Sequence, residues 1–520
     1  MLIPITVLLF ILPALALVIL HILRPNFRFF WLIAVGGSLL AWISLWIWLV
    51  RLPLIFQLPR WQPIDLFFHA PTFTADGLSW PFAISLGTLA LSIMLTAVVR
   101  QDLADPMPWA GTLLLTGVGM LAVTANNPLT LVLVWAALDL AELLTQLRSV
   151  ETPEASEQIV IGFASRVAGI GLVLWANVLS VTGGSRLDFA SMPADAGLFL
   201  LVAAGLRLGV LPLHLPYAAE SKLRRGVGTA MRLTSAASSL ALLARIPPES
   251  VASPLAPYLF LLVAAVAVYS SWTWLRAPDE LAGRPFWVLS LASLALISAL
   301  SASSAGVTGW GAALILAGGV LFLNSVQQVW LNRAMLAGAL TLSTLPFTLT
   351  ASAWDGASPV FLPAWLLLIA AQTMTIAGFA RHALRPGSRE PLDARPPFVR
   401  IFHSVGIGLL LVMALLLGFI GWDGALQVGN WIPAILVTLL TVGLVWAAPR
   451  LPFLNPIRAH WIRPSGASWV DLLYRGLWSL YQGLGRLSDV VTNALEGEGG
   501  VMWSLLFLAL LISFMSQVGR

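Results

Sequence analysis

The sequence predicts an all-α polytopic membrane protein. Its 520 residues are 59% apolar and only 10% charged, with a mean hydropathy of +0.90. Apolar runs of about 20 residues, the length of a helix that crosses a bilayer, recur from one end of the chain to the other. Charged residues stand mostly at the junctions between these runs, whereas a soluble chain has about a quarter of its residues charged. Because lipid offers the backbone no hydrogen bonds, each run is expected to be a helix.

The apolar runs indicate about 16 transmembrane helices. The first run, from Leu2 to Leu23, has neither the basic segment nor the cleavage site of a signal peptide, so it is expected to be a retained first helix. An even number of spans puts both termini on one side of the membrane. The helices are expected to begin near residues 3, 29, 78, 107, 128, 158, 195, 227, 254, 285, 306, 334, 360, 402, 430 and 500.

The basic residues predict the orientation. The odd-numbered loops hold 20 of the 28 Lys and Arg residues, and the even-numbered loops hold only four. The positive-inside rule therefore places the odd loops in the cytoplasm and the N-terminus outside, in a bacterial-type cytoplasmic (inner) membrane. This asymmetry accounts for the sequence pI of about 10.2, so no nucleic-acid partner is needed to explain it.

One segment near the C-terminus has a different pattern. From Trp469 to Leu495, apolar residues recur with a helical period while acidic, basic and amide residues share another face. This indicates an amphipathic lateral helix over residues 466–498 that is too polar to span, followed by a terminal anchoring helix over 499–520. Two placements stay open for the lateral helix: an interfacial helix resting on lipid, or a strut along the flank of the protein.

The chain contains no signature of a redox or catalytic centre. There is no cysteine, which excludes disulfides, thiolate metal sites and cysteine-ligated iron–sulfur clusters. There is also no phosphate-binding loop and no dinucleotide fingerprint. We therefore expect no cofactor, no metal and no catalytic centre in this chain, so any oxidoreductase activity would belong to an assembly of which it is a part.

Five ionisable residues fall inside the predicted spans, all between the fifth and the eighth. A charged group in the bilayer costs several kcal/mol, so each is a candidate functional residue. One interpretation is a buried ion-pair cluster that only stabilises the bundle. The other is a proton path, for which aspartate, glutamate and the nearby His214 can bind and release protons whereas arginine cannot. The five are Asp139, Glu142, Arg166, Arg207 and Arg232.

Prolines interrupt two of the predicted spans. Pro212 and Pro216 lie in the seventh span, and Pro346 lies in the twelfth, five spans later. Proline removes a backbone donor and breaks a helix. Interrupted helices at matching positions of two halves predict an inverted-repeat transporter with its site at the breaks.

Several motifs in this region resemble those of a known family. "DGLSWPF" at 76–82, "NNPLTLVLVWAALDL" at 126–140, "SRVAGIGLVL" at 165–174 and "RLGVLPLHLP" at 207–216 follow one another with the family's order and spacing. The chain thus resembles the antiporter-like, proton-translocating membrane subunits of respiratory complex I, membrane-bound hydrogenases and multisubunit cation/proton antiporters. The match covers roughly residues 70 to 355, and the span count resembles that of the largest complex I subunit of this kind.

The sequence departs from the family where the family's proton path would lie. The glutamate of the fifth helix falls on Ala136, with the nearest acid, Asp139, almost one turn later. The lysine of the eleventh helix falls on Gly311. Protons are therefore expected either to be rerouted through the remaining acids and water or not to pass at all. The seventh-helix lysine, the eighth-helix histidine and the terminal charge of the twelfth helix fall on Arg207, Arg232 and Asp355, and Arg166 is retained unchanged.

The resemblance implies a division of the chain into repeats. Two inverted five-helix repeats are expected, with helices 7 and 12 broken. The implied segments are 1–106 for helices 1–3, 107–250 for the first repeat, 251–385 for the second, 386–465 for helices 14 and 15 with their linkers, 466–498 for the lateral helix and 499–520 for the anchoring helix.

The resemblance also implies a function. It indicates a membrane-arm subunit of a complex I-like NADH/quinone oxidoreductase-type assembly, taking part in or derived from proton translocation coupled to electron transfer. Its partners would be other membrane subunits, the lipid bilayer, and protons or sodium ions. The alternatives are a subunit of a cation/proton antiporter, a membrane-bound hydrogenase or an inorganic-carbon uptake complex, and, from another class, a structural scaffold with a non-functional channel.

Overall fold

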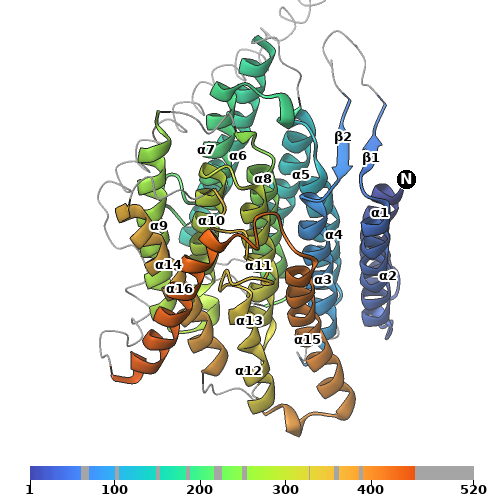
Figure 1. Cartoon of the computed structure of the whole chain (residues 1–520). Coiled ribbons are helices and arrows are strands. Elements are labelled where there is room, and N and C mark those ends of the chain that lie inside the picture. The colour runs from blue at the N-terminus through green and yellow to red at the C-terminus, as the bar shows by residue number, and fades with distance from the viewer. Residues whose placement is uncertain are drawn as a thin grey trace, which may run out of the picture. The chain divides into compact units, whose positions relative to one another are not determined.

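The computed structural model is almost wholly helical (Figure 1). It describes residues 1–59, 70–99, 105–147, 153–182, 188–215, 225–248, 254–326, 328–356, 362–385, 391–450 and 479. The chain divides into two units, Met1–Ile457 and Arg458–Arg520, and the labelled helices of Figure 1 belong to the first. Pro216, the predicted anchoring helix and, apart from Ser479, the predicted lateral helix lie outside the described residues.

The helices follow the order that the apolar runs predict. Thirteen of those described are long and apolar enough to cross a membrane, which makes this a polytopic membrane protein. A short antiparallel hairpin, β1 (Leu54–Gln57) with β2 (Thr72–Ala75), lies between the second and third helices. The helices are α1 (Leu2–Leu23), α2 (Phe30–Arg51), α3 (Ser79–Thr96), α4 (Met107–Thr124), α5 (Pro128–Leu147), α6 (Pro153–Thr182), α7 (Ala194–Leu208), α8 (Val227–Ala244), α9 (Ala256–Arg276), α10 (Glu280–Leu300), α11 (Ser304–Leu323), α12 (Val329–Met335), α13 (Ala337–Leu340), α14 (Leu362–Leu384), α15 (Pro397–Ile420) and α16 (Val428–Ala447).

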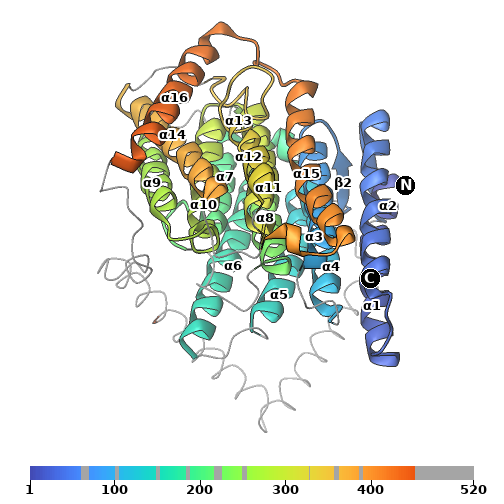
Figure 2. The same cartoon turned by 90° about the horizontal axis from the view of Figure 1, so that it is seen from below.

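The helices pack in two groups that meet along α8. In the first group α4 packs on α5 and α8, α5 on α6, α6 on α7, and α7 on α8. In the second, α9 packs on α10 and α14, and α10 on α11, while α8 joins the groups by packing on α10 and α11. Figures 1 and 2 show α1 and α2 at one edge and α16 at the other. The division into two inverted five-helix repeats stays a prediction.

The most buried helices are α3, α8 and α11, and α8 is buried together with its polar side chains, Arg232 among them. Every residue of α3 and α8 is buried, as is nearly all of α11, whereas α1, α2 and α16 each keep an exposed apolar face. An exposed apolar face on a membrane helix belongs against lipid, whereas a helix with polar and charged side chains, such as α8 with Arg232, belongs inside the bundle. The core therefore lies along α3, α8 and α11, next to the ionisable residues of α5 and α7.

The seventh and twelfth predicted spans are both interrupted. α7 ends at Leu208, where Gly209 adopts a left-handed conformation (φ +78°), and turns continue through Pro212. The twelfth span consists of the short helices α12 and α13, with turns around Pro346 after them. Gln372 of α14 donates from Nε2 to the carbonyl oxygen of Leu342 at 2.8 Å, which satisfies an acceptor that the end of the helix leaves open.

The tenth helix begins earlier than expected, at Glu280 and not near residue 285. Asp279 caps it, since its Oδ1 accepts hydrogen bonds from the backbone N–H groups of Leu281 and Ala282 at 2.9 and 2.8 Å. Pro285 lies in the second turn of this helix. The cap satisfies two orphan donors, and the helix therefore starts at the polar residues before the apolar run.

The motif "DGLSWPF" has a structural role at the start of α3. The Oδ1 atom of Asp76 accepts hydrogen bonds from the backbone N–H of Ser79 at 2.8 Å and from its hydroxyl at 2.9 Å. Its Oδ2 atom lies 3.1 Å from Nη1 of Arg245, at the end of α8. Asn127 plays a similar part at α5, where its Oδ1 accepts a hydrogen bond from the backbone N–H of Thr130 at 2.8 Å. The motif therefore ties the hairpin to the start of α3 and the end of α8.

Replacing Asp76 with alanine is expected to weaken this junction. The substitution removes a helix cap, which is usually worth about 1 kcal/mol, and the ion pair with Arg245. Because Asn keeps the capping oxygen but not the charge, Asp76→Asn should lose less stability than Asp76→Ala. Thermal unfolding of the two variants in detergent checks this, and equal losses would contradict a capping role.

Candidate functional site

Asp139 and Arg207 form a buried bidentate ion pair between α5 and α7. Nη1 of Arg207 donates to Oδ2 of Asp139 at 2.6 Å, and Nη2 donates to Oδ1 at 2.8 Å. Both side chains are fully buried. A two-point bond between guanidinium and carboxylate is among the strongest polar contacts in proteins, which offsets the cost of burying both charges. The contact expected from the sequence between Arg207 and an acid is therefore confirmed.

Arg166 of α6 joins the second acid to this pair. Its Nε lies 3.2 Å from Oδ1 of Asp139, and its Nη2 lies 3.6 Å from Oε2 of Glu142. Its carbonyl oxygen also accepts a hydrogen bond from Nη1 of Arg207 at 3.2 Å. Asp139, Glu142, Arg166 and Arg207, here called the charge cluster, thus hold two positive and two negative charges in contact. Mutual neutralisation is what makes four buried charges tolerable within a membrane.

Two residues around Arg207 shape its place in the cluster. The guanidinium carbon lies 4.0 Å from the ring centre of Trp135, a cation–π contact that supports a desolvated arginine. The indole Nε1 of Trp135 donates to the hydroxyl of Ser238 on α8 at 3.1 Å, which fixes the ring. On α6, a side chain at Gly169 would lie 2.7 Å from Cγ of Arg207. Glycine therefore makes room for the stem of the arginine.

The other predicted site residues are His214, Arg232 and Asp355. Nδ1 of His214 lies 2.8 Å from the carbonyl oxygen of Pro212, within the turn after α7. Arg232 is buried on α8. The carboxylate of Asp355 lies against Gly424, in the turn before α16. The structure thus brings four of the predicted residues into one cluster, and His214 lies near enough to Arg166 to interact with its charge.

The family's glutamate position on α5 faces outward in this chain. Ala136 is exposed, whereas Asp139 is fully buried. Three residues turn a helix by about 300°, which leaves the two side chains about 60° apart around the axis, and the edge of the buried face falls between them. An acid that meets Arg207 can therefore stand at residue 139 and not at residue 136.

The position of the eleventh-helix lysine has no room for a side chain. A Cβ atom at Gly311 would lie 2.2 Å from Cε1 of Phe82 on α3. Phe82 is fully buried, so its ring has no open space into which it could move. The aromatic ring therefore occupies the volume that a lysine would need.

Sequence reasoning missed a second group of buried polar residues. Arg225, Glu280, Asn324 and His403 lie near one end of the bundle, where α8 and α10 begin and α11 ends. Glu280 and Arg225 stand at the edges of apolar runs, so the sequence presents them as ordinary loop charges. The acid in the capping sequence "APDELAG" was the signal that could have placed Glu280 inside a helix.

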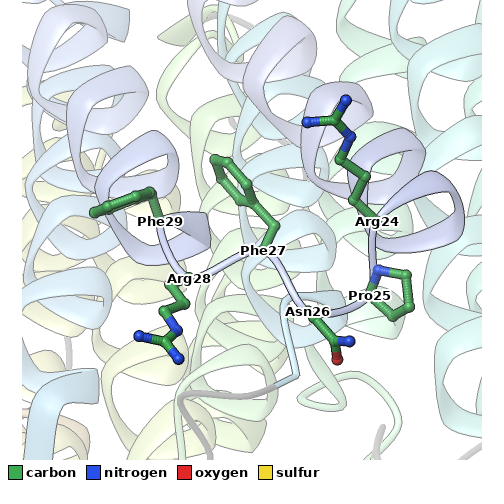
Figure 3. Close-up of a pocket in the computed structure, with 6 residues that line it drawn as sticks. All are labelled: Arg24, Pro25, Asn26, Phe27, Arg28 and Phe29. Carbon is green, nitrogen blue, oxygen red and sulfur yellow. The ribbon is translucent and has the colours of Figure 1, made fainter.

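Neither a metal centre nor a ligand cavity coincides with the charge cluster. In the described part of the chain, no three His, Cys, Asp or Glu residues are grouped so that they could hold a metal ion. The pocket in Figure 3 is lined by Arg24 to Phe29, in the loop between α1 and α2. None of the four cluster residues lines it.

The architecture is similar to that of chains in three membrane complexes. A chain of the Mrp complex from Dietzia sp. DQ12-45-1b superposes with a TM-score of 0.67 at 14% identity, over 100% of this chain and 63% of that one. The chain has the fold of an antiporter-like membrane subunit. A chain of the archaeal membrane-bound sulfane sulfur reductase gives 0.64 at 15% identity, over 98% of this chain and 99% of that one. A chain of respiratory complex I from Thermus thermophilus superposes with a TM-score of 0.61 at 19% identity, over 84% of this chain and 99% of that one.

By sequence, no family model and no curated protein matches the chain. The likeness to these complexes therefore lies in the backbone arrangement. The chain spans less than two thirds of the length of the Mrp chain and nearly the whole length of the other two.

Proposed function

We propose that this chain is an antiporter-like membrane-arm subunit of a complex I-like assembly, in which it takes part in proton translocation coupled to electron transfer. The observation that carries the proposal is the charge cluster, which lies beside the break after α7. Four ionised groups at that depth are costly, and membrane proteins place such groups on ion and proton pathways. Similar folds in multisubunit respiratory complexes support partners that are other membrane subunits.

Within the cluster, the two acids are suited to different roles. Protonating Asp139 would break its two hydrogen bonds with Arg207 and strand a buried cation. Protonating Glu142 would weaken the longer ion pair, at 3.6 Å from Arg166. Arginine does not release its proton near neutral pH, because its guanidinium group stays charged. We therefore assign the exchangeable proton of the first half to Glu142, and the task of holding the two arginines to Asp139.

Proton uptake by vesicles that carry the whole assembly tests this function. The variants are Glu142→Gln, Asp139→Asn and Asp355→Asn, each of which removes a titratable group without changing its size. Glu142→Gln is expected to lower the number of protons moved per turnover by a whole proton, because a glutamine cannot bind and release one. Measuring the uptake of sodium ions by the same vesicles identifies the coupling ion.

An exposed acid on the same helix as Arg207 provides the control. Asp195 lies in the first turn of α7 and faces outward, so Asp195→Asn should leave the stoichiometry unchanged. If Glu142→Gln and Asp195→Asn pump equally well in intact assemblies, the proton does not pass through the cluster.

A structural scaffold is the second candidate, and the filled position at Gly311 favours it. With Phe82 in the volume of the family's lysine, the second half lacks one group of the family's proton path. A scaffold would keep the assembly together without moving protons, so none of the three acid substitutions would alter the pumping stoichiometry. The same vesicle assay therefore separates the two functions.

A further inference from the structure

Arg225 joins the start of α8 to two helices of the second group. Its Nη2 donates to Oε1 of Glu280 at 2.7 Å, in the first turn of α10. Its Nη1 donates at 2.8 Å to the carbonyl oxygens of Phe322 and Asn324, where α11 ends. Each of these three bonds is at a normal hydrogen-bond distance and one is charge-assisted, so the guanidinium is firmly held.

The two charged partners differ in their access to water. The side chain of Glu280 is 4% exposed, and that of Arg225 is 20% exposed. Arg225 is therefore the more accessible partner of the pair, and the carboxylate of Glu280 is almost fully buried. Both residues fall in odd-numbered loops or at their edges, which the positive-inside rule assigns to the cytoplasmic side.

Glu280 can lose its charge without stranding Arg225. A guanidinium that loses the carboxylate still donates to the two carbonyl oxygens of α11. Those oxygens stand at the negative end of a helix dipole, where a cation is stabilised. Asp139 is in the opposite situation, because its arginine would keep one carbonyl acceptor only. The second ion pair is thus built so that Arg225 stays bound when the acid is protonated.

Further polar contacts lead inward from Glu280. Arg284 lies one turn further along α10, is buried, and donates from Nη1 to the hydroxyl of Thr229 on α8 at 2.8 Å. Thr229 precedes Arg232 by three residues, on the same face of α8. To the other side, Oδ1 of Asn324 lies 3.5 Å from Nε2 of His403 on α15. Polar groups therefore connect the site with the first helical group.

We propose that Glu280 is a proton-exchange group of this subunit, at the end of the bundle where α10 begins, with Arg225 as the residue that positions it. A proton from water binds a carboxylate oxygen of Glu280 to give the neutral acid, and leaves by the same oxygen, while Arg225 stays charged. The inference rests on the proposed function and supplies the second half with an acid in place of the group absent at Gly311. The charged and titratable neighbours of Glu280 include Arg225, Asp279 and Arg284, and His382 of α14.

Two measurements on Glu280→Gln test the proposal. Glutamine still accepts a hydrogen bond from Arg225 and has nearly the same size, but it cannot bind a proton at this position. In vesicles with the whole assembly, proton uptake is expected to slow by roughly tenfold or more, the scale for losing a proton-transfer group. Infrared spectra of the purified chain recorded during acid titration should show one protonated-carboxyl band that is present in the unmodified protein and absent from Glu280→Gln.

Asp279→Asn is the matched control, because it removes the neighbouring charge while asparagine remains a good helix cap. It should keep both the uptake rate and the infrared band of Glu280. Unchanged uptake in Glu280→Gln, or equal slowing in both variants, would overturn the proposal. Loss of proton uptake in Glu280→Gln with no change in the infrared band would also overturn the proposal. If the unmodified assembly moves no protons, the proposed function fails, and the infrared titration still decides whether Glu280 exchanges one.

Discussion

Replacing Arg207 with alanine is expected to destabilise the protein by about 3 kcal/mol or more, which is the usual cost of breaking a buried ion pair from one side. The substitution leaves Asp139 buried with Arg166 as its remaining cation and removes a cation–π contact with Trp135. It also opens a cavity beside Gly169, where the arginine stem lay. The yield of monodisperse protein in detergent and the midpoint of thermal unfolding measure the effect.

Two further variants separate loss of the ion pair from loss of bulk. Asp139→Leu combined with Arg207→Met replaces the pair with apolar side chains, and such replacements are often neutral or stabilising. We expect the double variant to be more stable than Arg207→Ala. Arg400 is an exposed arginine on α15, and Arg400→Ala should change little. Equal stability of Arg207→Ala and Arg400→Ala would show that the buried pair contributes nothing.

Replacing Gly311 with alanine is expected to cost about 2 to 3 kcal/mol, the usual cost of overpacking a core. The new methyl group would lie 2.2 Å from Cε1 of Phe82, whose ring is fully buried. Gly311→Lys should destabilise the protein more than Gly311→Ala does, and it should not create a working proton path. Thermal unfolding measures the first effect, and proton uptake by the assembled complex measures the second.

A glycine in open surroundings and a double-mutant cycle provide the controls. A Cβ atom at Gly171 on α6 would meet no neighbouring atom within 4 Å, so Gly171→Ala should not destabilise the protein. Phe82→Leu should reduce the clash at residue 311, which would appear as a favourable coupling energy between the two substitutions. If Gly311→Ala is tolerated as well as Gly171→Ala, Phe82 does not block the lysine position.

The sequence was sufficient for most of the helices, because lipid forces apolar runs into helices and the length of a run then places a span. α10 begins before its expected start, the sixteenth predicted span lies outside the described residues, and α7 and α13 end several residues before Pro212 and Pro346. The sequence was also sufficient for the presence of the charge cluster, because ionisable residues are rare in such runs and must find partners. These inferences need only local composition and the solvent.

Which residues meet was decided by the tertiary structure. Helical rotation points Asp139 inward and Ala136 outward, and the packing of α5 on α6 and α7 selects the inward face. Phe82 reaches the place of the missing lysine from a helix far away in the sequence. Arg225 and Glu280 come from separate loop edges that only the bundle brings within 2.7 Å. Spacing along one helix fixes a face, but the partner of that face depends on how helices distant in sequence pack together.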